Sequence, residues 1–517
     1  MVAATLLLVT VAVAVALWSF HCYVRGGKRG ELINKIPGPV ALPFIGNILS
    51  FLVPFEELWY VLRRHNRDYY PIYRLWSVRW PVVNLQHPDD LEVLLSSPKH
   101  IEKSLIYNFL HPWFGTGLLT STGTKWQTRR KILTPAFHFN VLQEFVDVFV
   151  DQADQLVNSL KAEGGSVVKD LLPLLTNYTL DTICETAMGT RLDGKSVLHS
   201  KYRSAVSEMS EVVIYRLVRP WTHPNWLFTL YPKYSVQKRA LKILHGFSTK
   251  IIGERTQYHD ENPGAFLESY QENGNYVNRS EIESSNGKKK KRLAMLDLLI
   301  AASRLHGRID DDGIREEVDT FMFRGHDTTA MGLCFALLLL AENKEIQDRA
   351  RREIDGIFEE SGGKITMAEV QRMTYLDRCI KEALRLFPSV PFISRQTAED
   401  LQLKNYVIPK DTIIQVHVYD LHRDPNFWPN PELFDPDRFL PERIQGRHPF
   451  SYVPFSGGPR NCIGQRFAML ELKTLISHIM YNFYMEPIDF TNDVRFYPDL
   501  VLRPGHPIRV KFVPRSA

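Results

Sequence analysis

Cys462 lies in a glycine-rich segment, residues 455–464, directly before a predicted helix. Glycines let the backbone approach a ligand closely, and the free amide groups at a helix start stabilise a thiolate. A single thiolate with no cysteine or histidine beside it is a poor structural zinc site, because such a site takes four ligands. It suits a haem iron, which takes one proximal protein ligand, and a purely structural cysteine is the competing interpretation.

Asp327 and Thr328 are adjacent in the run Gly-His-Asp-Thr-Thr at 325–329, inside a long predicted helix. A carboxylate next to a hydroxyl can relay protons to a reactant held away from bulk water. The competing interpretation is structural, since a helical threonine often donates a hydrogen bond to the carbonyl four residues earlier. The pair alone is compatible with both roles.

The ten residues 455–464 match the pattern F-x-x-G-x-R-x-C-x-G, and on this segment the chain resembles the cytochrome P-450 monooxygenases. Three further segments of that family occur in the expected order, at 325–329, 382–385 and 434–439. The resemblance implies a cytochrome P-450 fold, mainly α with a minor β region. It also implies a haem b cofactor (iron protoporphyrin IX) and a reaction that inserts one oxygen atom from O2 into a lipophilic substrate.

The resemblance assigns chemistry to three side chains. Cys462 corresponds to the axial ligand of the haem iron, which donates electron density from one face. Thr328 and Asp327 correspond to the catalytic pair that delivers protons during oxygen activation. Because both are present, the sequence favours oxygen activation over the family's peroxide-rearranging enzymes, which often lack this pair.

Glu382 and Arg385 are three residues apart and share one face of a predicted helix. An exposed pair at this spacing contributes only about 0.2–0.5 kcal/mol. Buried beside Arg438 of the following segment, the same residues would form a network in which losing one partner costs ~3–5 kcal/mol. The resemblance implies the second arrangement, a structural lock behind the haem.

Trp126 and Arg130 are four residues apart on a predicted helix and match the family's W-x-x-x-R, which binds a haem propionate. Arg395 and Arg460 match two further propionate partners. Arginine suits this task because its planar fork holds a carboxylate with two hydrogen bonds. A solvated arginine is the alternative for each of them seen singly.

The segments 111–119, 134–139, 183–189 and 315–323 narrow the resemblance to family 4, the fatty-acid omega-hydroxylases and related microsomal insect enzymes. Such enzymes oxidise the terminal carbon of a fatty acid or a similar long chain. The substrate-pocket candidates carried over by this resemblance are Phe114, Phe323, Arg324, Val390 and Phe392.

Arg324 departs from the family pattern, because many family 4 members carry a glutamate there that forms an ester with a haem methyl group. A guanidinium cannot form this ester, so the haem is predicted not to be covalently attached. A charged arginine near the haem needs a partner, and Asp327 or the propionates are the candidates. A substrate carboxylate at this position would place the wrong end of a fatty acid near the iron.

Helical periodicity dominates residues 50–260 and 293–387, with strand-like stretches at 70–85, 406–408 and 412–418. Residues 259–292 are polar and predict a solvated loop. A proline- and glycine-rich loop at 426–464 precedes a last helix at 465–483. One large, mainly helical domain follows from this pattern.

The N-terminus predicts a membrane anchor. Residues 2–24 contain no Asp, Glu, Lys or Arg, and as a helix they would span about 34 Å, enough to cross a bilayer. A cleaved signal peptide is the alternative, but the apolar run is long and no basic segment precedes it. The predicted divisions are a transmembrane anchor at 1–24, a basic and proline-rich hinge at 25–49, and a haem-thiolate catalytic domain at 50–517.

Charge and composition predict where the protein lies in the cell and which partners it has. Arg25, Lys28 and Arg29 follow the anchor and place the catalytic domain in the cytosol, on a single-pass protein of the endoplasmic reticulum membrane. The net charge of +5 is too small for a general nucleic-acid binder, and five scattered cysteines predict a reducing compartment. No dinucleotide fingerprint is present, so NADPH–cytochrome reductase is the implied electron donor, with cytochrome b5 as a second.

Three functional hypotheses remain open on the sequence. The first is omega-hydroxylation of a fatty acid or related lipid. The second is oxidation of a xenobiotic, steroid or hydrocarbon by the same chemistry. The third is a non-catalytic haem sensor or carrier in which Arg324 has disabled the oxygen site, although intact Asp327, Thr328 and Cys462 weigh against it.

Overall fold

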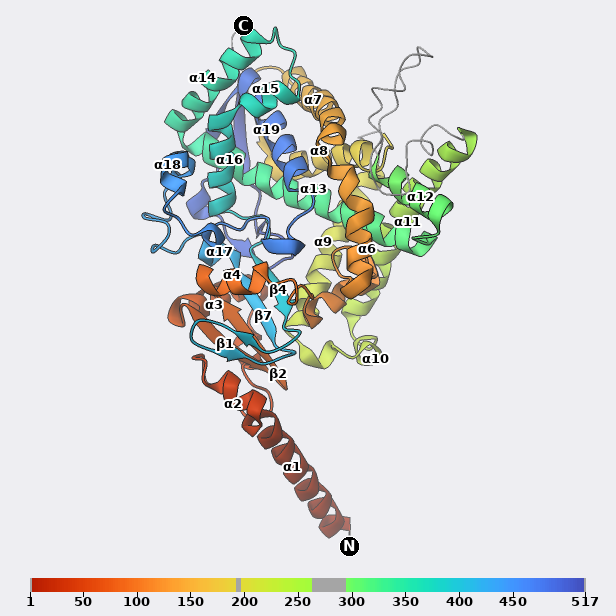
Figure 1. Ribbon diagram of the computed structural model, residues 1–517, viewed down its shortest axis with the longest axis vertical. Helices are drawn as coiled ribbons and strands as arrows, with labels where there is room; N and C mark the ends of the chain where they lie inside the picture. The colour runs from red at the N-terminus through yellow and green to blue at the C-terminus, as the bar shows by residue number, and fades with distance from the viewer. Residues whose placement is uncertain (1, 192–196, 263–293, 516–517) are drawn as a thin grey trace.

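The computed structural model describes residues 2–191, 197–262 and 294–515. Within these ranges the chain is mainly helical with small sheets, as predicted (Figure 1). Helix α13 (Asp311–Glu342) crosses the middle of the body, and its side chains are buried on nearly every face because helices surround it. The Asp310 side chain begins this helix by accepting a hydrogen bond of 2.9 Å from the Gly313 amide.

The helices around α13 form the body of the protein. Apolar side chains from them build one continuous core. The longer ones are α3 (Phe55–Asp68), α6 (Gly123–Leu133), α7 (Phe139–Ala162), α8 (Leu171–Thr186), α9 (Val197–Leu217), α11 (Pro232–Glu261), α12 (Met295–His306), α14 (Lys344–Glu360), α16 (Thr374–Leu386) and α19 (Gln465–Asn482).

A four-stranded sheet at the end of the body nearest the N-terminus holds a second, smaller core. Its order is β1 (Ile72–Ser77), β2 (Trp80–Leu85), β7 (Ile413–His417), β4 (Phe392–Gln396), and only β2 and β7 run parallel. A three-stranded antiparallel sheet joins β3 (Val167–Asp170), β11 (Arg509–Pro514) and β8 (Phe483–Pro487). Two short pairs complete the strands, β5 (Leu401–Gln402) with β6 (Val407–Ile408) and β9 (Phe496–Tyr497) with β10 (Arg503–Pro504).

The apolar N-terminal segment forms helix α1 (Val2–Gly26), which projects away from the body (Figure 1). It is long and apolar enough to cross a membrane, and it buries no side chain in the body. This helix is the candidate membrane anchor.

The segment 25–49 contains helix α2 (Lys28–Asn34) and lies against the four-stranded sheet. Ile33 and Ile36 are buried in the sheet's core, and the Arg25 guanidinium stacks 4.1 Å from the Trp76 ring centroid. The Asn47 side chain accepts a hydrogen bond of 2.9 Å from the Trp76 amide. These contacts fix the direction in which α1 leaves the body.

One predicted boundary and three strands differ from the sequence-based expectation. Helix α11 continues to Glu261, so the predicted loop begins later than residue 259, and residues 263–292 of that loop lie outside the described residues. Strands β3, β8 and β11 were not predicted. The pairing of β3 with β11 spans more than 300 residues of sequence, whereas β8 pairs with β11 close by in the chain. The predicted strands at 406–408 and 412–418 correspond to β6 and β7.

Candidate functional site

The Cys462 loop turns tightly just before α19. The Cys462 amide donates a hydrogen bond of 2.9 Å to the Phe455 carbonyl, which closes the loop. Gly458 has a φ of +68°, and a Cβ added there would lie 1.8 Å from the Leu95 carbonyl oxygen. Only glycine fits that position, since neither the backbone angle nor the space allows a side chain. The loop therefore holds the Cys462 thiol at the wall of a cavity.

This cavity lies between the Cys462 loop, α13 and α6, and most of its lining is apolar. Among its described lining residues there is no aspartate or glutamate, although four cations line it: Lys103, Arg130, Arg324 and Arg460. Cations beside an apolar cavity without acidic partners indicate a site for an anionic ligand.

Helix α6 supplies two of the predicted cofactor residues from one face, since they are four positions apart. Trp126 is buried, and the Arg460 guanidinium lies 5.1 Å from its ring centroid. Arg130 donates to the Asn461 carbonyl at 3.0 Å and to the Asn461 side-chain oxygen at 2.9 Å. Arg130 thus holds the residue next to Cys462, which ties α6 to the cysteine loop.

Arg395 on β4 and Arg460 beside the cysteine are both buried, and neither contacts a carboxylate in the described structure. Arg460 donates to the backbone carbonyls of Ile101 and Ser121 at 2.8 and 2.5 Å. Arg395 has only two long hydrogen bonds, 3.2 Å to the Ser394 carbonyl and 3.4 Å to the Ser456 hydroxyl. Burial, with the neighbouring charge of Arg395, lowers the pKa of Arg460 to about 9.

These residues fit an iron protoporphyrin. One thiol faces an apolar space, and buried arginines without carboxylate partners suit the two propionates. A metal ion bound only by protein side chains is not an alternative to this assignment. No group of three or more His, Cys, Asp or Glu that could hold a metal ion occurs within the described ranges.

Thr328 and Asp327 point in different directions from α13. Thr328 lines the cavity, and its hydroxyl donates to the Arg324 carbonyl at 2.6 Å. Asp327 is buried outside the cavity lining and forms an ion pair of 2.7 Å with Arg503 of β10. Arg503 also pairs with Asp499 at 2.5 Å. Burial would lower the pKa of Arg503, but the two carboxylates raise it above its ordinary value.

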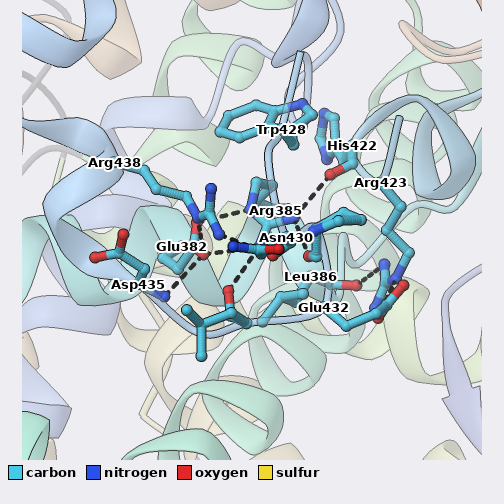
Figure 2. A network of polar contacts seen from close by, with 12 residues as sticks. Glu382, Arg385, Leu386, His422, Arg423, Trp428, Asn430, Glu432, Asp435 and Arg438 are labelled. Carbon is cyan, nitrogen blue, oxygen red and sulfur yellow. Dashed lines mark hydrogen bonds and ion pairs between the residues drawn. The ribbon is translucent and has the colours of Figure 1, made fainter. Parts of the chain in front are cut away.

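Glu382, Arg385 and Arg438 are buried together in one network (Figure 2). The Arg385 guanidinium donates two hydrogen bonds of 2.7 Å to the Glu382 carboxylate, and Arg438 lies 3.2 Å from it. The Asp435 amide donates to the same carboxylate at 3.0 Å. Every charge in this network therefore faces a partner of opposite sign.

Backbone carbonyls accept hydrogen bonds from most of the remaining donors of the network (Figure 2). Arg385 donates to the carbonyls of His422, Pro431 and Leu433 at 2.7 to 3.1 Å. Arg438 donates to the carbonyls of Pro429 and Asn430 at 2.6 and 2.8 Å. The network thus anchors the irregular 422–438 segment to α16, a structural task that needs no exposed or unpaired group.

The substrate-pocket candidates separate into two groups. Arg324 and Val390 line the main cavity, and Phe392 lines a second one. Phe114 and Phe323 line neither of these two cavities, contrary to expectation. Both are buried and pack against Trp113, Phe114 stacked at a ring-centroid distance of 4.3 Å and Phe323 tilted at 4.9 Å, so they form part of the core.

The second cavity is apolar and lies between the four-stranded sheet, α3 and the end of α9. Its lining includes Asn47, Ile48 and Phe51, at or just after the end of the connector that follows α1. Nearby large apolar side chains are exposed, among them Trp226 and Leu230 at 72 and 74%. Short helix α10 (Asn225–Phe228) carries Trp226.

Two residues of the site were not singled out by the sequence. Lys103 follows Glu102 directly and lies four positions after Lys99, so nothing in the local sequence distinguishes it. Arg503 lies 176 residues from Asp327, so no spacing pattern connects them. Both are placed by tertiary structure alone.

Several basic residues near the cysteine loop are already engaged. Lys125 pairs with Glu316 at 2.9 Å, and Arg129 is buried. The Arg447 guanidinium lies 4.0 Å from the Trp428 ring centroid. Lys131 on α6 is exposed. Arg466, in the first turn of α19, is exposed as well.

Comparison with known proteins gives consistent matches along the whole chain. A family model described as Cytochrome P450 matches residues 36–512. The chain is 43% identical over 497 residues to "Cytochrome P450 4c3" of Drosophila melanogaster, covering 95% of this chain and 91% of that protein. It is 40% identical over 494 residues to "Cytochrome P450 4V2" of Homo sapiens, covering 95% and 92%. It is 38% identical over 504 residues to "Cytochrome P450 4c21" of Blattella germanica, covering 97% of both.

Proposed function

Because the chain belongs to family 4 of the cytochrome P450 monooxygenases, we propose that it hydroxylates the terminal carbon of a fatty acid or related long-chain lipid. The supporting observation is the main cavity, which combines one thiol, apolar walls and the Thr328 hydroxyl. Apolar walls suit a hydrocarbon chain, and a confined space near the thiol favours attack at a chain end.

Cys462 would hold the haem iron through its thiolate, and Trp126, Arg130, Arg395 and Arg460 would hold the propionates. When bound, the haem supplies the redox chemistry that activates dioxygen. The surrounding protein excludes water and fixes the thiolate in the loop before α19.

The haem is proposed to be held without a covalent bond, because Arg324 cannot form an ester. Reversed-phase chromatography under denaturing conditions should separate the haem of the wild-type protein from the polypeptide. After turnover, Arg324→Glu should retain part of its haem on the polypeptide. Haem that co-elutes with the wild-type chain would overturn this part of the proposal.

Thr328 and Asp327 are the proposed proton-handling pair. Thr328 can offer its hydroxyl to the cavity by releasing its hydrogen bond to the Arg324 carbonyl. Asp327 is buried behind it and ion-paired, so a proton reaches Thr328 through a rearrangement at Arg503 or through water. Arg503 is therefore a positioning residue for Asp327.

The body is proposed to sit on the cytosolic face of the endoplasmic reticulum membrane, with residues 1–24 as anchor, 25–49 as connector and 50–517 as catalytic domain. Support comes from the basic residues after α1 and the exposed apolar side chains near α10. The second cavity lies on this side and would admit lipophilic substrates from the lipid. Electrons are proposed to come from NADPH through a membrane-bound reductase, with cytochrome b5 as a second donor.

Reconstitution with reductase, NADPH and a panel of saturated and unsaturated fatty acids tests the proposal, with products identified by mass spectrometry. Terminal hydroxylation is the expected outcome. Oxidation of a xenobiotic, steroid or hydrocarbon instead would keep the monooxygenase and replace the substrate class. A thiolate-type spectrum of the reduced, CO-bound protein with no substrate-dependent NADPH use would indicate a haem sensor or carrier.

A further inference from the structure

Residues 115–121 form a tight loop that supplies part of the wall of the main cavity. The Ser121 amide donates a hydrogen bond of 2.8 Å to the Gly117 carbonyl, which closes the turn. Between them, Leu118 and Leu119 are buried and line the same cavity as the cysteine thiol. These two side chains are therefore part of the surface that a chain bound near the thiol would meet.

Two adjacent glutamates near the start of α13 hold this loop by its backbone. The Glu317 carboxylate accepts a hydrogen bond of 3.0 Å from the Leu118 amide. The Glu316 carboxylate accepts one of 2.8 Å from the Thr116 amide. A Cβ added at Gly117 would lie 2.8 Å from the Glu316 carbonyl oxygen, so the loop backbone lies directly on the helix. The position of the loop therefore follows that of α13.

The far end of the loop is held by the residue two positions before the cysteine. Arg460 donates hydrogen bonds of 3.0 and 2.5 Å to the carbonyls of Leu119 and Ser121. The loop thus spans from α13 to the cysteine loop and is fixed at both ends. If the attachment to α13 is lost, Leu118 and Leu119 can move relative to the thiol.

Glu317 holds the loop at a cost in free energy. Its side chain is fully buried, and its second carboxylate oxygen accepts no hydrogen bond from the residues that the structure describes. The Arg129 Nε lies 3.7 Å from that oxygen, which is beyond hydrogen-bond distance. Burial raises the pKa of Glu317 to about 7. An apolar side chain of similar volume would avoid this cost, so stability alone does not account for a carboxylate here.

We propose that Glu317 is a positioning residue for regioselectivity, because its bond to the Leu118 amide keeps Leu118 and Leu119 in place as a steric stop in the cavity wall. The inference rests on the proposed hydroxylation of a long chain. A fixed wall admits the narrow end of an unbranched chain, whereas a relaxed wall also admits the wider bend that presents an inner carbon. One methylene group in an apolar pocket changes selectivity by about 10- to 200-fold, so a small movement of this wall has a measurable effect.

Product analysis tests this role in the full-length protein reconstituted with reductase, NADPH and a saturated fatty acid. Glu317→Leu fills the volume but cannot accept from the Leu118 amide, whereas Glu317→Gln keeps an acceptor. The ratio of terminal to penultimate hydroxylation should fall about tenfold in Glu317→Leu and stay within about twofold of wild type in Glu317→Gln. An equal fall in both variants would overturn the role of this hydrogen bond.

Glu353→Leu is the matched control. Glu353 on α14 accepts hydrogen bonds of 2.8 and 2.9 Å from the amides of Tyr375 and Leu376 at the start of α16. It is not among the described residues that line the main cavity. The same type of contact is lost away from the wall, so this variant should lower stability and leave the product ratio unchanged.

Leu118→Ala removes part of the steric stop directly and should lower the product ratio as well. If Glu317 acts through the loop, the double variant Glu317→Leu/Leu118→Ala should change the ratio by clearly less than the product of the two single effects. Effects that multiply in full would show that Glu317 acts by another route and would overturn the proposal.

A binding measurement separates this inference from the substrate class. The haem absorbance change is titrated with imidazole and with the bulkier 4-phenylimidazole, which need a haem but no turnover. Glu317→Leu should shift the ratio of the two Kd values about tenfold in favour of the bulkier ligand, and Glu317→Gln and Glu353→Leu should not. A lack of fatty-acid hydroxylation would overturn the proposed substrate and leave this test intact. If the Kd ratio of Glu317→Leu equals that of Glu353→Leu, Glu317 does not position the wall.

Discussion

The network of Glu382, Arg385 and Arg438 and the cluster of Lys103, Arg324 and Arg395 both bury charged groups, but in opposite ways. In the network, one carboxylate faces two guanidinium groups, and backbone carbonyls accept hydrogen bonds from most of the remaining donors. In the cluster, three cations share a region with no carboxylate in the described structure. The first arrangement is complete without a ligand, and the second is not.

This difference separates two uses of buried charge. A satisfied network stabilises the fold, and removing one member leaves the others unpaired. An unsatisfied cluster destabilises the ligand-free protein and is stabilised when an anion binds. A substitution in the network should therefore mainly lower the free energy of unfolding. A substitution in the cluster should mainly lower haem affinity.

Glu382→Gln should have the largest effect. It leaves Arg385 and Arg438 buried without a charge partner, so the free energy of unfolding should fall by ~3–5 kcal/mol. Urea unfolding followed by circular dichroism measures this. Glu345→Gln, on the exposed start of α14, is the matched control. An unfolding midpoint equal to that of the control would show that the network is not needed for the fold.

Asp327→Asn should lower turnover much more than the free energy of unfolding. Arg503 keeps its partner Asp499, so unfolding should cost only about 1 kcal/mol. Turnover should fall about a hundredfold or more if Asp327 handles protons. Product formation per NADPH is the readout. Equal losses in stability and turnover would make Asp327 a structural residue like Glu382.

Arg395→Met should move stability and haem affinity in opposite directions. It removes a buried cation that has only two long hydrogen bonds and cationic neighbours. The haem-free protein should be as stable as wild type or more so, while haem transfer to apomyoglobin accelerates roughly tenfold to a hundredfold. A clear loss of stability in the haem-free protein would place Arg395 with the satisfied network instead.

Local sequence patterns located those parts of the site whose residues are close together in the sequence. The cysteine loop precedes α19 at the predicted residue, and Glu382 and Arg385 share a helix face because they are three positions apart. The main helices followed from periodicity in the same way. These features depend on interactions within one or two turns.

Contacts between distant segments could not be predicted in this way. The ion pair of Asp327 with Arg503 and the approach of Lys103 to Arg324 depend on how whole elements are placed. Phe114 and Phe323 were expected at the pocket, but packing against Trp113 draws them into the core. An apolar side chain in a pocket segment can face either side of the wall, and the sequence does not say which.

The pH dependence of the haem-free protein gives the smallest and most direct test of the unsatisfied cluster. The folded-state pKa of Lys103 lies well below its ordinary 10.5, because of burial and the neighbouring guanidinium groups. Between these two values the unfolded chain binds the extra proton, so the free energy of unfolding should rise with pH, by about 1.4 kcal/mol per unit. Above 10.5 the contribution is constant.

Urea titrations of haem-free wild type and Lys103→Met between neutral and alkaline pH isolate this contribution by difference. Arg460, with its pKa lowered to about 9 chiefly by burial, adds a change of the same sign in both proteins, so the difference reports mainly Lys103. With haem bound, carboxylates near the ammonium should return its pKa toward the ordinary value, and the difference should shrink. A difference that is independent of pH in the haem-free protein would mean that Lys103 is solvated, and the contrast with the Glu382 network would then rest on Arg324 and Arg395 alone.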